Sequence, residues 1–454
     1  MKKSILILSI AILHVLSLHL HNAAAQVQVD TDKMDLYFNT LFENNRFIGS
    51  VTILSGDEVV FNKAYGKADE SGVPVSPESI YRIGSIAKTY TAVMIMQLIE
   101  QGEITLDTRL AEFFPELPNA DKITIEQLLR HKSGLYNFTN LPEYMEYYTE
   151  PKTREELIEI FIEAGTSFDA GEGTEYSNTA FVTLGFIIED VTGKPFAEAF
   201  EGMIAEPLGL KRTYVGDGID TSTGEVESFK YTEGNWQLQP QTDMSIPGAA
   251  GAVVANSYET AYFFRALFDG KLLSNESLAK MQTFDGPFGL GLIQFPFNEK
   301  TAYGHNGGID GFLSTAAIFT DQDITFSVLA NGVNYNFNNI LVGLLSITFG
   351  EEFEIPEFVD REPITLSGEE LKLYSGTYSS AQFPLDITVF HEDGKLKAQA
   401  TGQGAFELTI LDHQTMTVEA AGIEMVFEEK EDGRYKAFNF SQGGLSLRFT
   451  LEEE

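Results

Sequence analysis

In the stretch Tyr81-Arg-Ile-Gly84-Ser85-Ile-Ala-Lys88-Thr-Tyr-Thr-Ala92, a short extended segment leads into an apolar helix. Residues three apart on a helix share one face, so the Lys88 amine can reach the Ser85 hydroxyl. If Ser85 opens the helix, its oxygen also lies at the positive end of the helix dipole, which favours developing negative charge. Because a serine hydroxyl is weak until a neighbouring base takes its proton, the pair predicts an activated nucleophile.

A second Ser-x-x-Lys, Ser277-Leu-Ala-Lys280, occurs later in the chain. The motif fixes only two letters, so about one chance match is expected in a chain of this length. Asn275 can act as a helix cap just before this copy, which indicates an ordinary polar helix start. The helix after Ser85 is apolar almost all round, which is typical of a central buried helix. An exposed lysine does not fit there, and context therefore favours Ser85 over Ser277.

The chain is long enough, at 454 residues, for more than one domain and a substantial core. Residues 1–25 differ from the rest. Lys2-Lys3 precedes an apolar run over 5–20, and Ala23-Ala-Ala25 follows as a small-residue cleavage pattern. We therefore expect a cleavable signal peptide, a mature chain from Gln26, and a secreted or periplasmic protein.

Composition excludes several classes of function. The chain has no cysteine, so disulfides and thiolate chemistry are excluded. The 67 acidic and 30 basic residues argue against nucleic acid as a partner, because phosphate binding depends on Lys and Arg. No segment after the signal is long and apolar enough to span a bilayer. Only four histidines remain after signal removal, and we expect neither a metal nor a cofactor.

Strand patterns lie at both ends of a first domain over 26–350. Residues 47–54 and 58–65 predict two strands joined by a turn, and residues 312–319 and 324–330 predict a second hairpin. Helices and loops are expected between them. This order predicts an α+β fold, an antiparallel sheet flanked by helices, with a helical subdomain.

A change of composition predicts a second domain. Pro356 and Pro363 indicate a linker over 351–365. Short alternating strands separated by turns such as Asp393-Gly394 and Asp432-Gly433 fill residues 366–454. We expect a small all-β barrel or sandwich there.

Two further groups of polar residues follow Ser85 along the chain. Tyr176-Ser-Asn178 comes after a glycine-rich segment, whereas the other Tyr-x-Asn, Tyr37-Phe-Asn39, lies on the first predicted helix. His305-Asn-Gly307-Gly308 enters the predicted hairpin. Acyl transfer to serine needs groups that move protons and backbone N–H donors that face the oxyanion. Glycine lets a substrate come close to the backbone, because it has no Cβ.

These motifs resemble the serine β-lactamase and penicillin-binding-protein superfamily, on the side of class C β-lactamases, DD-peptidases and esterase relatives. The Ser-x-x-Lys, Tyr-x-Asn and Lys-Thr-Gly elements of that family match Ser85/Lys88, Tyr176/Asn178 and His305-Asn-Gly307 in order. Supporting segments are Leu128-Leu-Arg-His131-Lys-Ser-Gly134-Leu135, Glu206-Pro-Leu-Gly-Leu210 and Gly248-Ala-Ala-Gly251. The C-terminal region is similar to the lipocalin-like domain that often follows such hydrolases.

The resemblance implies a role for each matched residue. Ser85 would be acylated, Lys88 and Tyr176 would share the proton transfers, and Asn178 would orient the substrate. The amides of Ser85 and Gly308 would form the oxyanion hole. Which of Lys88 and Tyr176 is the base stays open at this point.

The sequence departs from the family at His305, where β-lactamases carry a lysine that helps to hold the substrate carboxylate. A largely neutral imidazole is a poorer anchor, so we expect weak β-lactamase activity. His131 would be a structural residue at a helix C-terminus. The leading hypothesis is a secreted serine hydrolase that forms an acyl-enzyme with an ester or amide, including D-amino-acid peptides. The alternatives are a penicillin-binding or sensing protein with little turnover, and a β-lactamase.

Overall fold

The structure, a computed structural model, describes residues 27–358, 363–380, 383–418, 421–442 and 445–452. The predicted signal peptide lies outside these residues. Within them, no helix has the length and apolar character needed to cross a membrane.

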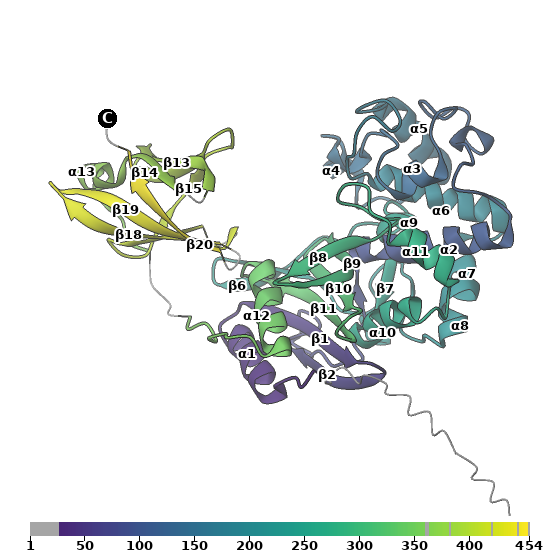
Figure 1. Cartoon of the computed structure of the whole chain (residues 1–454), viewed down its shortest axis with the longest axis horizontal. Coiled ribbons are helices and arrows are strands. Elements are labelled where there is room, and N and C mark those ends of the chain that lie inside the picture. The colour runs from purple at the N-terminus through teal and green to yellow at the C-terminus, as the bar shows by residue number, and fades with distance from the viewer. Residues whose placement is uncertain (1–26, 359–362, 381–382, 419–420, 443–444, 453–454) are drawn as a thin grey trace, which may run out of the picture.

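A large antiparallel sheet forms the centre of the first domain (Figure 1). Its strands run in the order β2 (Glu58–Tyr65), β1 (Phe47–Ser55), β11 (Ile324–Val333), β10 (Phe312–Phe319), β9 (Lys300–Ile309) and β8 (Ile293–Phe297). The hairpin β5 (Phe229–Thr232) and β6 (Asn235–Leu238) joins at β11. The predicted α+β fold and both terminal hairpins are confirmed.

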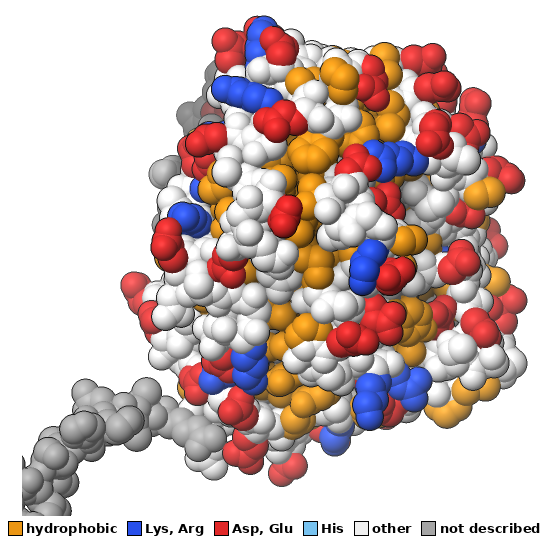
Figure 2. All heavy atoms as spheres, turned by 90° about the vertical axis from the view of Figure 1, so that its right-hand side faces the viewer, with side chains coloured by type: hydrophobic (Ala, Val, Ile, Leu, Met, Phe, Trp, Pro, Cys, Tyr) orange, Lys and Arg blue, Asp and Glu red, His pale blue; other side chains and the backbone are white. Residues whose placement is uncertain are grey.

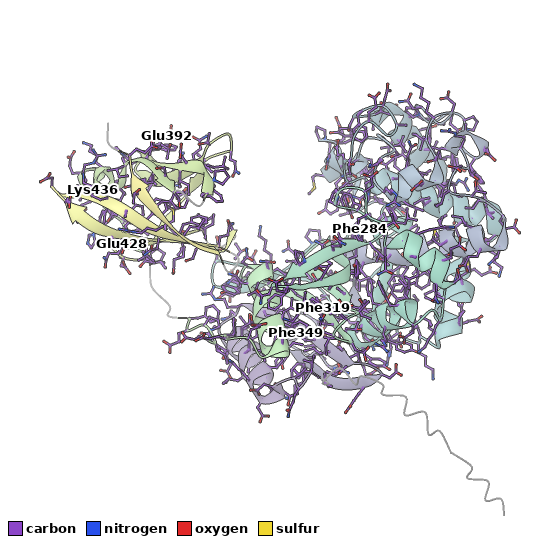
Figure 3. All side chains as sticks on the ribbon, in the orientation of Figure 1. Phe284, Phe319, Phe349, Glu392, Glu428 and Lys436 are labelled. Carbon is purple, nitrogen blue, oxygen red and sulfur yellow. The ribbon has the colours of Figure 1, made fainter. Side chains whose placement is uncertain are left out.

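Helices cover both faces of this sheet, which explains why every residue of β1 is buried. On one face, α1 (Thr31–Glu43) and α12 (Phe337–Phe349) share a core with β1, β10 and β11. Phe319 and Phe349 meet there edge to face, with ring centroids 4.9 Å apart (Figure 3). On the other face, α2 (Ala87–Gln101) and α10 (Ser257–Phe268) belong to the largest apolar cluster. The sheet is therefore the middle layer of three.

A helical region extends from α2 and holds the segments that reach the site. Its helices are α3 (Ile125–Leu129), α4 (Tyr144–Tyr147), α5 (Arg154–Ala164), α6 (Asn178–Thr192), α7 (Phe196–Phe200), α8 (Glu206–Leu208), α9 (Gly248–Gly251) and α11 (Asn275–Met281). A small sheet joins β3 (Tyr81–Arg82), β7 (Val253–Ala255) and β4 (Tyr214–Val215). Acidic side chains, with basic ones among them, are spread over the surface of this region (Figure 2).

One local prediction was wrong. Ser85 does not open the long helix, because it lies in a separate 3-10 turn, Gly84–Ile86, and α2 begins at Ala87. Gly84 has a φ of 52°, a left-handed conformation that bends the chain sharply between β3 and the turn. The serine therefore sits on a tight corner before the helix.

The C-terminal region forms a separate antiparallel sheet that curves into a nearly closed barrel with its own apolar core. Helix α13 (Gly368–Leu371) precedes its strands, which are β12 (Gly376–Ser380), β13 (Phe383–Glu392), β14 (Lys395–Ala400), β15 (Phe406–Glu407), β16 (Thr409–Ile410), β17 (Thr415–Val418), β18 (Ile423–Glu431), β19 (Arg434–Gln442) and β20 (Leu445–Leu451). The predicted β domain is confirmed. Its likeness to lipocalins and the boundaries 26–350, 351–365 and 366–454 stay predictions, and residues 359–362 lie outside the described chain.

Candidate active site

Ser85 lies where the corner before α2 meets the edge of β9. A side-chain carbon at Gly84 would lie 2.8 Å from the Gly308 nitrogen, so only glycine fits this contact. A side-chain carbon at Gly307 would lie 2.1 Å from the Ile83 carbonyl oxygen and 3.0 Å from the Ser85 nitrogen. The two glycine-containing segments are therefore packed backbone to backbone around Ser85.

Lys88 is fully buried on the first turn of α2, beside the serine. Its Nζ lies 3.0 Å from Ser85 Oγ, 2.8 Å from Asn178 Oδ1 and 2.8 Å from the Ala250 carbonyl oxygen. No carboxylate is among these partners. Burial therefore lowers the pKa of Lys88 well below its usual value, because the charged form loses hydration without gaining a counter-ion.

Tyr176 approaches the same serine from the loop before α6. Its hydroxyl lies near the Ser85 side chain, and its ring centre lies 4.9 Å from Lys88 Nζ. Burial raises the pKa of Tyr176, and the interaction with Ser85 offsets only part of this rise. The phenol therefore keeps its proton at neutral pH.

Asn178 is the first residue of α6 and is held on both sides. Its backbone N–H donates to Asn137 Oδ1 at 3.0 Å, and its Nδ2 donates to Thr139 Oγ1 at 3.1 Å. These bonds turn Oδ1 towards Lys88. Ser177 caps the helix through the Ala180 N–H.

His305 lies on β9, next to the tyrosine. Its ring centre is 6.4 Å from that of Tyr176, and its Nδ1 contacts the Asn306 carbonyl oxygen at 2.5 Å. Burial is the main cause that lowers the pKa of His305 to about 3, and the positive charge of Lys88 contributes less. The imidazole is therefore neutral at physiological pH and offers no positive charge to a substrate carboxylate.

The structure thus brings together the predicted site residues Ser85, Lys88, Tyr176 and Asn178 by direct contacts, with His305, Gly307 and Gly308 on the adjoining strand. The second Ser-x-x-Lys lies elsewhere, on α11. There Lys280 pairs with Glu276 at 2.9 Å on the exposed side of the helix. The second Tyr-x-Asn is also separate, because Tyr37 packs in the core between α1 and α12.

Sequence analysis placed His131 in a purely structural role and missed its closeness to the site. The ring centre of His131 lies 4.5 Å from that of Tyr176, and its Nδ1 accepts a hydrogen bond from the Ser177 N–H at 3.1 Å. Burial keeps the pKa of His131 low, so the acceptor nitrogen stays unprotonated. His131 follows the end of α3 with a φ of 57°, a rare conformation for a non-glycine residue. It is well placed to hold the tyrosine in position.

Sequence analysis also missed a buried ion pair just before the nucleophile. Arg82 Nη1 lies 2.9 Å from Asp310 Oδ2, and both side chains are 1% exposed. Arg82 also donates to the carbonyl oxygens of Thr242 and Asp217. The bonds of Arg82 therefore hold the β9–β10 turn and residues 239–242 against β3. An arginine three residues before a candidate nucleophile was the available signal.

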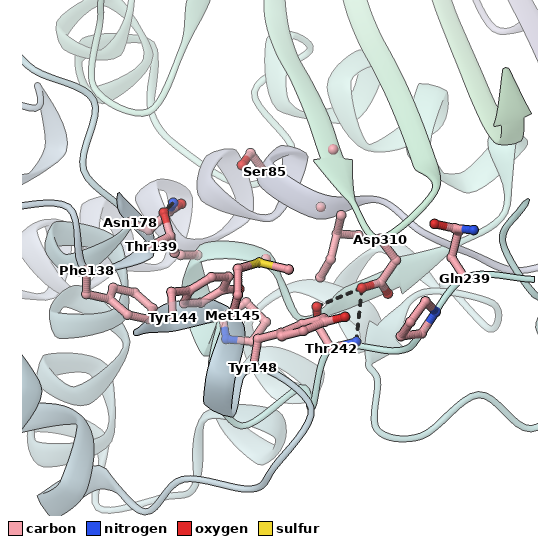
Figure 4. A pocket seen from close by; sticks show the side chains of 17 residues that line it. Ser85, Phe138, Thr139, Tyr144, Met145, Tyr148, Asn178, Gln239, Thr242 and Asp310 are labelled. Carbon is pink, nitrogen blue, oxygen red and sulfur yellow. Dashed lines mark hydrogen bonds between the residues drawn. The ribbon is translucent and has the colours of Figure 1, made fainter. Parts of the chain in front are cut away.

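A cavity of about 390 Å³ opens beside Ser85 (Figure 4). Ser85, Asn178 and Gly308 are among the residues that line it, so a bound molecule can reach the nucleophile from the cavity. The arrangement provides a serine nucleophile, a buried amine 3.0 Å from it, a phenol near it, and two backbone N–H groups on facing segments. Such a set can transfer an acyl group to serine.

Comparisons with known proteins agree with this site. Residues 35–342 match the family model described as Beta-lactamase. Penicillin-binding protein 4* of Bacillus subtilis is 26% identical over 442 residues, covering 90% of this chain and 95% of its own. Esterase EstB of Burkholderia gladioli is 30% identical over 244 residues, covering 49% of this chain and 60% of its own.

A solved structure is also similar, the D-amino acid amidase of Ochrobactrum anthropi SV3 complexed with L-phenylalanine amide. It has a TM-score of 0.58 and 26% identity, covering 66% of this chain and 91% of its own. The family match spans the whole sheet and helical region, including every segment that reaches Ser85. The chain therefore belongs to the β-lactamase and penicillin-binding-protein family.

Proposed function

We propose that this member of the family is a secreted serine acyl hydrolase that cleaves an uncharged ester or amide through an acyl-enzyme at Ser85. The observation that carries the proposal is the buried Lys88 amine, 3.0 Å from Ser85 Oγ and without a carboxylate partner. A charged lysine at this position would be strongly disfavoured. The neutral amine is the form that can take a proton.

The partners of Lys88 favour it as the base. Asn178 Oδ1 and the Ala250 carbonyl oxygen can only accept hydrogen bonds, and a neutral amine has two N–H groups to give them. Its lone pair then remains for the third partner, Ser85 Oγ. The serine proton therefore moves to Lys88 as Oγ bonds to the substrate carbonyl carbon.

Tyr176 is suited to the opposite task. Its raised pKa keeps the phenol protonated, and its hydroxyl lies against Ser85. As the bond to the leaving group breaks, the phenol donates a proton to that group and is reprotonated from Lys88. Water then attacks the acyl carbon, the acid is released, and Ser85 regains its proton. The Ser85 and Gly308 N–H groups are the candidate donors to the oxyanion in both halves of the reaction.

The charges around Ser85 favour an uncharged substrate. None of the residues that line the cavity in the described chain is Lys or Arg. Burial lowers the pKa of Lys88 well below its usual value and that of His305 to about 3, and the whole chain carries a formal net charge of −37. A substrate carboxylate would lose hydration here without a counter-ion. EstB, by its name, is an esterase, and the D-amino acid amidase, by its name, acts on amides, which supports esters and amides over β-lactams.

A penicillin-binding protein with slow deacylation is the second candidate. Similarity to penicillin-binding protein 4* extends over 90% of the chain, including the C-terminal domain. This candidate uses the same acylation chemistry. The two differ in the lifetime of the acyl-enzyme.

Three substrates and one label test the proposal. The purified chain is given p-nitrophenyl acetate, nitrocefin and a D-Ala-D-Ala peptide, and its intact mass is followed with a fluorescent penicillin. We expect rapid ester cleavage and little nitrocefin turnover. A penicillin adduct that persists, without ester turnover, would favour the second candidate. The absence of any Ser85-dependent reaction would contradict both.

A further inference from the structure

The cavity beside Ser85 has one aromatic end. Phe138, Tyr144 and Tyr148 line it, together with Met145 from α4 (Figure 4). The Tyr144 ring lies 5.9 Å from the Phe138 ring and 6.0 Å from the Tyr148 ring. Phe138 is fully buried and therefore fixes the position of the group. These rings form a continuous apolar wall opposite the nucleophile.

The charged group at this end is already paired within the protein. The Tyr144 hydroxyl lies near the Thr242 side chain, and the ring supplies apolar contact area for a ligand. Asp310 also lines the cavity, but its Oδ1 accepts from the Thr242 N–H at 3.0 Å and from the Thr242 hydroxyl at 2.7 Å. Its Oδ2 pairs with Arg82. The carboxylate is neutralised and does not select a substrate amine.

Size and adaptability point to a ring-sized occupant. About 390 Å³ exceeds what an acetyl group fills by a wide margin, and pockets that bind small molecules begin at a similar volume. Met145 is 67% exposed at the rim, where its flexible thioether can close over an apolar group. A small acyl group would leave most of this apolar wall without contacts.

We propose that the cavity binds a flat, uncharged acyl group, phenylacetyl or one of similar size, and so makes the enzyme selective for aromatic acyl esters or amides. This inference depends on the proposed function, since it assigns the substrate class of the same site. The acyl group is the part of the substrate that remains after the leaving group departs, bonded to Ser85 until water releases it. It is therefore the part that a cavity opening at Ser85 can hold throughout.

The test compares p-nitrophenyl esters that share one leaving group. The acyl groups are acetyl, butyryl, phenylacetyl and 4-carboxyphenylacetyl, each measured with wild type and with Ser85→Ala. We expect kcat/KM for the phenylacetyl ester to exceed that for the acetyl ester by about 10- to 100-fold. This is the gain expected when a ring is buried in a fitted pocket. For the 4-carboxyphenylacetyl ester, kcat/KM should be at least about tenfold lower than for the phenylacetyl ester, because its carboxylate would lose hydration in the cavity.

Failure of the inference and failure of the proposed function give different results. Ser85-dependent hydrolysis with acetyl equal to or better than phenylacetyl overturns the aromatic pocket and leaves the function standing. Hydrolysis that survives Ser85→Ala overturns both. A 4-carboxyphenylacetyl ester cleaved as fast as the phenylacetyl ester overturns the selection for an uncharged group.

A pair of variants tests whether the aromatic wall causes the preference for the phenylacetyl ester. Tyr148→Ala should lower the phenylacetyl-to-acetyl ratio at least about fivefold, because it removes one ring face. Tyr262→Ala is the matched control, since Tyr262 stacks on Tyr258 along α10 and does not line the cavity. An unchanged ratio in a folded Tyr148→Ala protein overturns the assignment.

Discussion

Ser85-Ile-Ala-Lys88 and Ser277-Leu-Ala-Lys280 share one motif but have opposite surroundings. Lys88 is fully buried and makes three contacts with oxygens, one of them Ser85 Oγ. The Lys280 side chain is 47% exposed and pairs with Glu276 one turn away on α11. Ser277, on the same helix, has a backbone N–H capped by Ser274. The spacing is equal, so the chemistry of the first copy comes from its burial and its neighbours.

The difference shows how a lysine becomes a base. A solvated ammonium keeps its proton at neutral pH, whereas burial without a counter-ion removes it. The first copy also lies on a corner, Gly84–Ile86, that exposes Ser85 to the cavity. The second copy begins an ordinary capped helix.

The largest contrast is expected between the two serines. Ser85→Ala should lower kcat/KM for p-nitrophenyl acetate by about 10⁴-fold or more, because the nucleophile is lost. Ser277→Ala should change it less than about twofold. Steady-state rates of both purified variants measure the contrast. Equal losses in both would remove the basis for separating the two motifs.

The two lysines are expected to differ almost as much. Lys88→Met should reduce kcat by about 10³-fold, within the range of general base catalysis. Lys280→Met breaks an exposed i,i+4 pair worth about 0.5 kcal/mol and should leave kcat unchanged. Single-turnover acylation, followed by the release of p-nitrophenol, isolates the step. A burst of normal rate in Lys88→Met would assign the base to another residue.

The two Tyr-x-Asn motifs allow a parallel comparison. Tyr176→Phe removes the hydroxyl that lies near Ser85 and should lower kcat by about 10²-fold. Tyr37→Phe removes a hydroxyl bonded to the Asn339 carbonyl oxygen, at a cost in unfolding free energy of about 1 kcal/mol. Only the second variant should lower Tm while preserving kcat. A loss of activity in Tyr37→Phe alone would reverse the assignment.

The pH dependence should follow Lys88. Its pKa is lowered by burial, so the active neutral form appears well below about pH 10, and kcat/KM rises with pH through that titration. His305, with a pKa of about 3, should cause no change in kcat/KM near pH 6. Profiles of wild type and His305→Gln from pH 4 to 10 measure both points. A limb near pH 6 that His305→Gln abolishes would contradict the neutral imidazole.

Stability should show the same titration. Between the folded and unfolded pKa values of Lys88, the unfolded chain binds the extra proton, so the free energy of unfolding rises with pH. Wild type should therefore gain stability relative to Lys88→Met as pH increases towards about 10. Urea unfolding at several pH values detects the trend, and a constant difference would place a charged lysine in the core.

The smallest effect is expected at the cap of the second motif. Ser274 Oγ accepts the Ser277 N–H at 3.3 Å at the start of α11. Ser274→Ala should lower the unfolding free energy by about 1 kcal/mol without changing kcat. Thermal unfolding and steady-state rates together check it, and a loss of activity at unchanged Tm would give α11 a role that its contacts do not indicate.

Much of the fold follows from local pattern. The hairpin of β1 and β2, the hairpin of β10 and β11, and the Thr124–Gln127 capping box at α3 are all visible in the sequence. The order of the motifs also led to Ser85, Lys88, Tyr176 and Asn178, which do meet in space. Local pattern failed at the start of α2, because Ser85 lies in the 3-10 turn Gly84–Ile86 and the α-helix begins only at Ala87.

The remaining features depend on contacts between distant segments. The cavity is lined by the aromatic wall and by Thr242 and Asp310 from distant segments, and no periodicity relates these positions. The Ala250 carbonyl oxygen reaches Lys88 only because α9 packs against α2, a contact that the small residues Gly248–Gly251 allow. His131 resembled a helix end in sequence, and only the structure shows its ring against Tyr176.

The strand order of the central sheet has a consequence for biosynthesis. β1 pairs with β11 in the middle of the sheet, with Ser55 opposite Ile324, so the first strand has no partner on that side until most of the domain has been made. Such distant pairing slows folding and leaves an apolar edge exposed in the meantime. A nascent chain of this kind can stay unfolded long enough for chaperones to engage it.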